Sequence, residues 1–146
     1  RLPFVILASD ALRKILFPSP LYDEDENKRL FPVCHALIEE LLTKGIPIIF
    51  DATNLLERHR EYLYHAAEKA GAKLTLVCVE APPEVVRQRL VSREKGFTPQ
   101  DDSQASWEVY RKMKSHKEKV SRNYFVVDTS EDATAAIDRI VRIIKK

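Results

Sequence analysis

Two carboxylates follow closely on apolar stretches of the sequence. Asp10 comes two residues after the run Pro3–Ala8, and Asp51 comes directly after the run Ile46–Phe50. Short, almost entirely apolar runs predict β-strands that are covered on both faces. Residues that follow two parallel strands of one sheet emerge at the same edge, so we expect Asp10 and Asp51 to lie together there. Carboxylates in that place can hold Mg²⁺ or its waters for phosphoryl transfer. Taken singly, each is equally well explained as a helix cap or a turn residue.

A guanidinium group accompanies the first of these carboxylates. Arg13 follows Asp10 by three residues, so on a helix both side chains project to the same side. Such a pair could take a proton from a hydroxyl group and hold an anionic part of a substrate. A surface ion pair within one helical turn is the commoner explanation when the pair is considered alone.

Three arginines form a second candidate cluster. Arg89 and Arg93 are four residues apart and share a helix face, with Arg87 close by. Like charges in this arrangement repel each other, so an anion between them would relieve the repulsion. The segment 87–122 carries ten Lys/Arg and five Asp/Glu, in a chain whose net charge is +2. We interpret residues 87–103 as a lid that closes on phosphate, although most charged runs are solvated faces.

The helix expected after this lid carries aromatic residues among cations. Trp107 and Tyr110 are followed by five basic residues, Arg111, Lys112, Lys114, Lys117 and Lys119. This pattern could form a stacking surface for nucleic acid. The commoner explanation is that Trp107, Tyr110 and Met113 dock the helix while the lysines face water.

Four apolar runs separated by segments of helical period indicate the fold. The expected strands are Pro3–Ala8, Ile46–Phe50, Leu74–Val79 and Tyr124–Val127. The expected order is strand, helix pair, strand, helix, strand, two helices, strand, helix. This alternation predicts an α/β fold, a three-layer parallel sheet with helices on both faces. Ligands of such sheets bind at the carboxyl ends of the strands.

Local signals suggest where two of the helices begin and end. The helix pair after the first strand should end at Gly45, and Pro32 predicts either a kink or a late start of its second helix. The next helix should open near Asn54 and close at Gly71.

Composition bounds the class of protein. The chain has 146 residues, of which 45% are hydrophobic, and we expect one domain over residues 1–146. With 24 basic and 22 acidic residues, it is neither a histone-like nucleic-acid binder nor an acidic disordered tail. Its apolar runs fall far short of the roughly 20 residues that span a bilayer, and its start does not read as a signal peptide. We therefore expect a cytoplasmic protein with no membrane partner.

Taken in order, these segments resemble a known family. They are Ser9–Arg13, Ile48–Leu55 with Arg58 and Arg60, Arg89–Arg93, Ser106–Tyr110 and Val126–Ser130. The chain resembles the P-loop kinases along essentially its whole length. The resemblance is closest to the branch of 5′-polynucleotide kinases, zeta-toxin-like kinases and small AAA-type ATP-binding proteins.

The resemblance implies roles for the acceptor and metal residues. Asp10 would be the general base that takes the proton of the acceptor hydroxyl, and Arg13 would help to place the acceptor. Asp51 would lie at the Mg²⁺–ATP site as a metal ligand, with Thr53 and Asn54 in the nucleotide-binding segment.

The resemblance to the P-loop kinases also implies a role for the lid and an overall activity. Arg89 and Arg93 would bind the nucleotide and stabilise the transferring phosphoryl group. The implied function is an ATP-dependent phosphotransferase that uses ATP and Mg²⁺ and acts on a nucleic-acid 5′-hydroxyl or a small molecule. Two alternatives remain: a non-catalytic nucleotide-binding module, and a nucleic-acid-binding module that uses segment 87–122 without chemistry.

One family feature is missing from the sequence. The P-loop kinases begin with a strand followed by Gly-x-x-x-x-Gly-Lys-Ser/Thr, which cradles the phosphates. The three glycines here, Gly45, Gly71 and Gly96, lie elsewhere. We expect a central strand and its phosphate loop, about 25 residues in all, to lie N-terminal to this sequence. Without that strand, apolar strand edges would be exposed.

Overall fold

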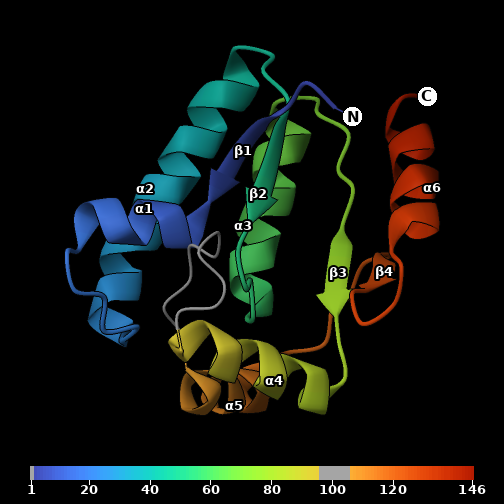
Figure 1. Cartoon of the computed structure of the whole chain (residues 1–146). Coiled ribbons are helices and arrows are strands. Elements are labelled where there is room, and N and C mark those ends of the chain that lie inside the picture. The colour runs from blue at the N-terminus through green and yellow to red at the C-terminus, as the bar shows by residue number, and fades with distance from the viewer. Residues whose placement is uncertain (1, 96–105) are drawn as a thin grey trace.

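The computed structural model describes residues 2–95 and 106–146 as an α/β fold (Figure 1). The elements are β1 (Val5–Ala8), α1 (Ser9–Leu16), α2 (Glu24–Thr43), β2 (Ile48–Asp51), α3 (Glu57–Lys69), β3 (Val77–Glu80), α4 (Pro83–Glu94), α5 (Trp107–His116), β4 (Phe125–Asp128) and α6 (Thr134–Ile144). The predicted class and element order are confirmed. Residues 96–103 of the predicted lid lie outside the described residues.

The strands pair in parallel, as predicted, and within the described residues they form two sheets of two strands each. β1 pairs with β2, and β3 pairs with β4. In Figure 1, β2 and β3 lie between β1 and β4 with their arrowheads at the same end. Each strand therefore has a hydrogen-bonded neighbour on one edge only, where the sequence predicts interior strands.

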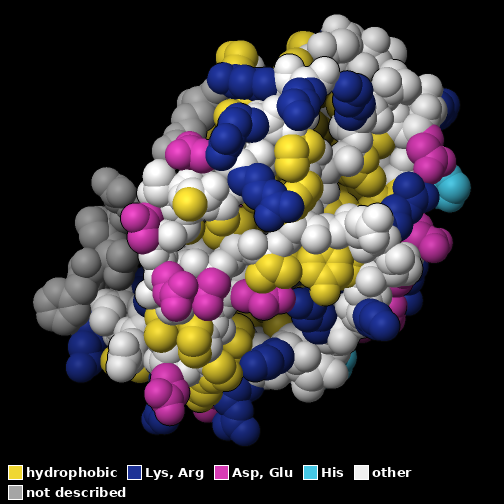
Figure 2. All heavy atoms as spheres, turned by 90° about the vertical axis from the view of Figure 1, so that its right-hand side faces the viewer, with side chains coloured by type: hydrophobic (Ala, Val, Ile, Leu, Met, Phe, Trp, Pro, Cys, Tyr) yellow, Lys and Arg dark blue, Asp and Glu magenta, His cyan; other side chains and the backbone are white. Residues whose placement is uncertain are grey.

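The apolar strands are consequently only partly covered. Ile6 of β1 is 70% exposed, Val79 of β3 is 67% exposed, and Val126 of β4 is 50% exposed. Figure 2, which views the side of β3, β4 and α6, shows apolar side chains at the surface between groups of Lys and Arg. The expectation that these strands are covered on both faces is wrong for the described residues, because no strand or helix among them covers these side chains.

The core lies between α2, α3 and the first sheet. Leu30, Cys34 and Ile38 recur every four residues along α2 and are buried, and Tyr64 of α3 is buried as well. α2 packs on β2 and on α3. In the second sheet, by contrast, Val127 is the one buried strand residue among those described.

α2 starts early and runs through its proline. The side chain of Asp23 accepts a hydrogen bond from the backbone N–H of Glu26, which caps the helix before Glu24. A late start at Pro32 is therefore wrong. Because Leu30 and Cys34 on either side of Pro32 are both fully buried, their packing offsets the loss of the backbone hydrogen bond that the proline cannot donate.

The helix α3 ends where the sequence predicts but begins later than predicted. Gly71 has φ +67 directly after the helix, and Gly45 has φ +72 after α2, so both glycines end helices as predicted. Asn54 does not open α3, which begins at Glu57 after the capping residue Leu56. Asn54 instead adopts the left-handed backbone conformation, with φ +44.

None of the helices in the described ranges combines the length and the hydropathy needed to cross a bilayer.

Candidate functional site

The parallel register of β1 and β2 places the two candidate carboxylates at one edge. Ala8 lies opposite Asp51 in the register, and α1 begins directly after Ala8. Asp10 is therefore in the first turn of α1, two residues beyond the end of β1. The predicted common edge is confirmed. The side chain of Asp10 is 33% exposed and Asp51 is exposed, so both carboxylates are open to solvent.

Arg13 is buried rather than part of a surface ion pair. Its Nη1 donates to Oε1 of Glu26 and its Nη2 donates to Oδ1 of Asn27, each at 2.8 Å. Its Nε lies 3.8 Å from Oδ1 of Asp10, beyond hydrogen-bond distance, and has no other partner in the described residues. The ring of Tyr22 covers the guanidinium at 4.8 Å. Arg13 thus joins α1 to α2 while keeping Nε toward Asp10.

Glu26 holds this arrangement together, and the sequence analysis missed it. Besides Arg13, its carboxylate accepts hydrogen bonds from the backbone N–H groups of Leu21 and Tyr22 at 2.5 and 3.0 Å. Burial raises the pKa of Glu26, but these hydrogen bonds and the Arg13 charge outweigh it and hold the pKa below its ordinary value. One signal was available: Glu26 precedes buried Leu30 by four residues and so shares the buried face of α2.

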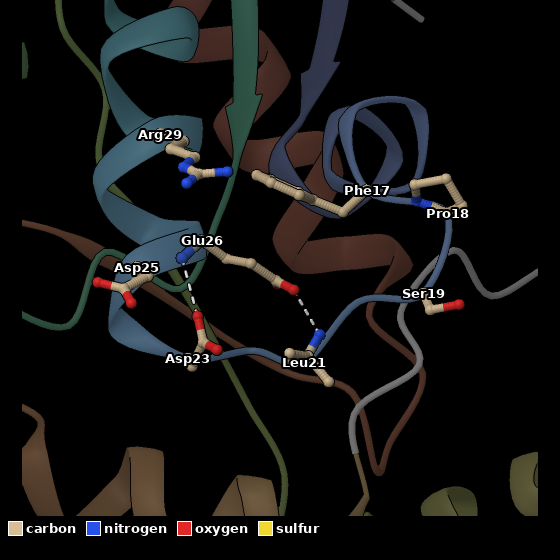
Figure 3. A pocket seen from close by; sticks show the side chains of 8 residues that line it. All are labelled: Phe17, Pro18, Ser19, Leu21, Asp23, Asp25, Glu26 and Arg29. Atoms are coloured by element: carbon tan, nitrogen blue, oxygen red, sulfur yellow. Dashed lines mark hydrogen bonds between the residues drawn. The ribbon is translucent and has the colours of Figure 1, made fainter.

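A pocket of about 420 Å³ adjoins Glu26 where α1 leads into α2 (Figure 3). It is lined by Phe17, Pro18, Ser19, Leu21, Asp23, Asp25, Glu26 and Arg29. Tyr22 beside it has φ +56, a conformation that L-residues rarely adopt. The pocket is open to solvent, and its lining mixes apolar side chains with three carboxylates and one guanidinium. Glu26 lines the pocket and also holds Arg13, so the pocket is linked to the Asp10 edge.

The loop after β2 is held by a second buried arginine. The three side-chain nitrogens of Arg60 donate to five acceptors, namely the carbonyls of Asn54, Leu55, Glu118 and Lys119 and the carboxylate of Glu57. Arg60 therefore fastens the segment after α5 to the loop that carries Thr53 and Asn54. Thr53 is exposed, and Oδ1 of Asn54 is buried without a hydrogen-bond donor among the described residues.

Arg89 is engaged at the carboxyl ends of the second sheet. Its Nη1 donates to Oγ1 of Thr129 at 2.7 Å, and its Nη2 donates to the carbonyl of Thr129 at 2.6 Å. The N–H of Thr129 in turn donates to the carbonyl of Glu80, the last residue of β3. Arg89 thus ties α4 to the ends of β3 and β4. Arg93 lies one helical turn further along α4 and is half-buried.

The aromatic residues of α5 pack against α4. The rings of Trp107 and Tyr110 stack with centroids 5.2 Å apart, and the guanidinium of Arg87 lies 5.9 Å from the Trp107 ring. The lysines that follow are exposed, as expected. Trp107, Tyr110 and Met113 are half-buried while no described residue of α4 or α5 is fully buried, so these side chains dock α5 on α4 rather than into the core.

The described residues offer candidate ligands for Mg²⁺ but no glycine-rich loop for the phosphates of ATP. Mg²⁺ is commonly held by one or two carboxylates together with phosphate oxygens and water, and Asp51 and Asp10 offer such carboxylates at one edge. In residues 2–95 and 106–146 no three His, Cys, Asp or Glu side chains form a metal-binding group. Gly45 and Gly71 end helices, so these ranges contain no glycine-rich cradle for phosphates.

Comparison with known proteins identifies related sequences and folds. A family model described as an AAA domain matches residues 1–120. A solved structure from Chloroflexus aurantiacus J-10-fl, described as a "putative kinase", aligns with a TM-score of 0.68 at 18% identity, over 97% of this chain and 82% of the other. A gluconokinase from Sinorhizobium meliloti 1021 aligns with a TM-score of 0.63 at 18% identity, over 97% of this chain and 79% of the other. No curated protein matches the chain.

Proposed function

Because the chain belongs to the AAA domain family, a group with the fold of P-loop kinases, we propose that it acts in an ATP-dependent kinase that phosphorylates a hydroxyl group. The observation that carries the proposal is the register of β1 and β2. It brings Asp10 and Asp51, which are 41 positions apart in the sequence, to the ligand-binding edge of one parallel sheet. The solvent-exposed carboxylates there provide the base and the metal ligand that phosphoryl transfer needs.

The residues at this edge have distinct tasks in the proposal. Asp10 accepts the proton of the acceptor hydroxyl on a carboxylate oxygen. The buried Arg13, whose Nε lies 3.8 Å from Oδ1 of Asp10, helps to place the acceptor through that carboxylate. Asp51 holds Mg²⁺, with Thr53 and Asn54 in the loop beside it. ATP, when bound, supplies the phosphoryl group.

The lid arginines complete the site from the other sheet. Arg89 and Arg93 lie on α4, which Figure 1 places beyond the arrowheads of the strands, at their carboxyl ends. Their charges stabilise the equatorial oxygens of the transferring group. To bind the nucleotide, Arg89 has to break its hydrogen bonds to Thr129 and form new ones to the phosphates.

The proposal includes a fifth strand outside this sequence. Within residues 2–95 and 106–146, β2 and β3 each pair with another strand on one edge alone, and Ile49, Val77 and Val79 of these two strands are exposed. A parallel strand between β2 and β3 would pair with both and join the two sheets. The loop after that strand would supply the phosphate cradle that residues 2–95 and 106–146 do not contain.

The acceptor belongs to one of two classes. The pocket lined by Phe17 and Arg29 favours a small molecule, whereas the resemblance to polynucleotide kinases favours a nucleic-acid 5′-hydroxyl. Labelled phosphate transferred from ATP to gluconate, to a nucleoside or to a 5′-hydroxyl oligonucleotide would distinguish them.

The first test is binding of ATP to the intact protein, measured by calorimetry with and without Mg²⁺. We expect Mg²⁺-dependent binding that is weakened by Asp51→Asn, with Asp132→Asn, which lies before α6, as a control. A protein that does not bind ATP would contradict the proposal. The second candidate is a nucleotide-binding module without catalysis. It would bind ATP but would not hydrolyse it, even slowly, and would not transfer its phosphate.

A further inference from the structure

The outer side of α4 and α5 carries an aromatic pair framed by cations from both helices. Arg87 of α4 lies over Trp107, and the ammonium of Lys114 lies 5.9 Å from the Tyr110 ring. Arg111 follows Trp107 by four residues, and Lys114 follows Tyr110 by four, so all four side chains share one face of α5. We define the α4–α5 surface by these five residues, Arg87, Trp107, Tyr110, Arg111 and Lys114.

This surface is strongly basic and lies at the periphery of the fold. Residues 87–95 and 106–122 contain ten Lys/Arg and only three Asp/Glu. Arg87, Arg111 and Lys114 are exposed, whereas Trp107 and Tyr110 are half-buried. Neither helix has a fully buried residue among those described, and the packing of α5 on α4 covers the two aromatic residues only in part.

The surface is also held firmly in place. The N–H of Glu118, two residues after α5, donates to the carbonyl of Leu55, and Arg60 binds the carbonyls of Glu118 and Lys119. The C-terminal end of α5 is thereby fastened to the loop after β2. A preformed surface loses little conformational entropy when a partner binds.

From this combination we infer that the α4–α5 surface docks single-stranded nucleic acid. Unpaired bases stack on exposed aromatic rings, and the phosphates that follow them pair with flanking Lys and Arg. Both cations lie near the outer limit of cation–π range, so a base can replace them at the rings while they move to phosphates. An acidic protein segment matches the charges but offers no series of flat rings to stack.

Binding of an oligothymidylate of about 12 nucleotides to the intact protein without ATP tests this inference, and it is independent of phosphoryl transfer. The fluorescence of Trp107, the single tryptophan of this sequence, should be quenched on binding, and Trp107→Ala should weaken binding several-fold in the anisotropy measurement. Labelled oligonucleotide anisotropy measures the affinity of every variant. A plot of the logarithm of the binding constant against the logarithm of the salt concentration should have a slope of about −2, since each of the three cations contributes about −0.7 to the slope.

A matched pair of variants locates the contact. Lys114→Gln should weaken binding several-fold and reduce the slope by about 0.7. Lys112→Gln, on the opposite face of the same helix, should change neither, and circular dichroism should show both variants folded. Absence of binding, equal losses in the two variants, or equal quenching by polyglutamate would each overturn the inference.

Discussion

The guanidinium of Arg13 and the carboxylate of Glu26 form an ion pair inside the protein, with 2.8 Å between Nη1 and Oε1. Arg13 is 4% exposed and Glu26 is 6% exposed. Because Glu26 also binds the N–H groups of Leu21 and Tyr22, this pair fixes the turn between α1 and α2. The wall of the pocket and the position of Arg13 beside Asp10 therefore depend on one carboxylate.

Replacing this carboxylate should be costly for stability. Glu26→Gln leaves the buried guanidinium of Arg13 with the more distant Asp10, 3.8 Å from its Nε, as its counter-charge, which should lower the free energy of unfolding by about 3 kcal/mol. Urea denaturation measures the loss. Glu40→Gln is the control, because both side chains of the Glu40–Lys44 pair are exposed and such a pair contributes little to stability. Equal losses in the two variants would contradict the structural role of Glu26.

The general-base assignment predicts a defect in turnover. In the intact protein, Asp10→Asn removes the proton acceptor beside Arg13 and should lower turnover by roughly 10²- to 10⁴-fold. Affinity for ATP should change little, as calorimetry can show. Asp132→Asn, which lies before α6, provides a control carboxylate away from both the pocket and the β1 edge. Turnover at the unmodified rate in Asp10→Asn would remove the assignment.

The lid assignment predicts a difference between arginines and lysines. Arg89→Ala and Arg93→Ala should each weaken nucleotide binding or slow transfer, since each removes a charge at the carboxyl ends of the strands. Lys117→Gln and Lys119→Gln should leave transfer to a small acceptor unchanged. Steady-state kinetics at two salt concentrations measures both sets. Equal losses in the lysine variants, varying with salt, would instead favour a polynucleotide acceptor.

A histidine cluster between α2 and α3 predicts a pH dependence of stability. The ring of His35 stacks on Tyr62 at 4.2 Å, and Phe31 lies 5.3 Å from His59. Burial lowers the pKa of His35, the charge of His59 lowers it further, and Glu39 opposes both. Burial and Arg58 likewise lower the pKa of His59, against Glu118.

The sign of the effect follows from proton binding. Since the folded pKa of His35 is below about 6.5, the unfolded chain binds more protons between the two values. Stability should be complete above pH about 6.5 and should fall as the pH drops through the folded pKa. Denaturation midpoints at several pH values measure this, and His35→Asn should flatten the curve. Exposed His65→Asn should leave it unchanged, and an unaltered curve in His35→Asn would refute the prediction.

The proposed fifth strand predicts a pattern of amide protection. In the intact protein, backbone N–H groups on the edges of β2 and β3 that are not paired with β1 or β4 should exchange slowly with solvent, because a neighbour accepts their hydrogen bonds. In the isolated 146-residue chain the same groups should exchange fast. Hydrogen-exchange mass spectrometry compares the two, and equally fast exchange in both would contradict a strand between β2 and β3.

The order of elements was predictable from the sequence because their signals are local. Each apolar run and each helical period is encoded by a few consecutive residues. Gly45 and Gly71 likewise favour the end of a helix whatever packs around them. The common edge of Asp10 and Asp51 follows from this order as well. Once both strands are parallel in one sheet, residues after them emerge on the same side.

The partners of the buried arginines were decided by the tertiary structure alone. Arg13 meets Glu26 13 positions away, and Arg60 meets the carbonyl of Glu118 58 positions away. No periodicity encodes such pairs, since they form only when packing brings the segments together. Pro32 shows the same limit, because the local cost of a proline within α2 was outweighed by the burial of Leu30 and Cys34.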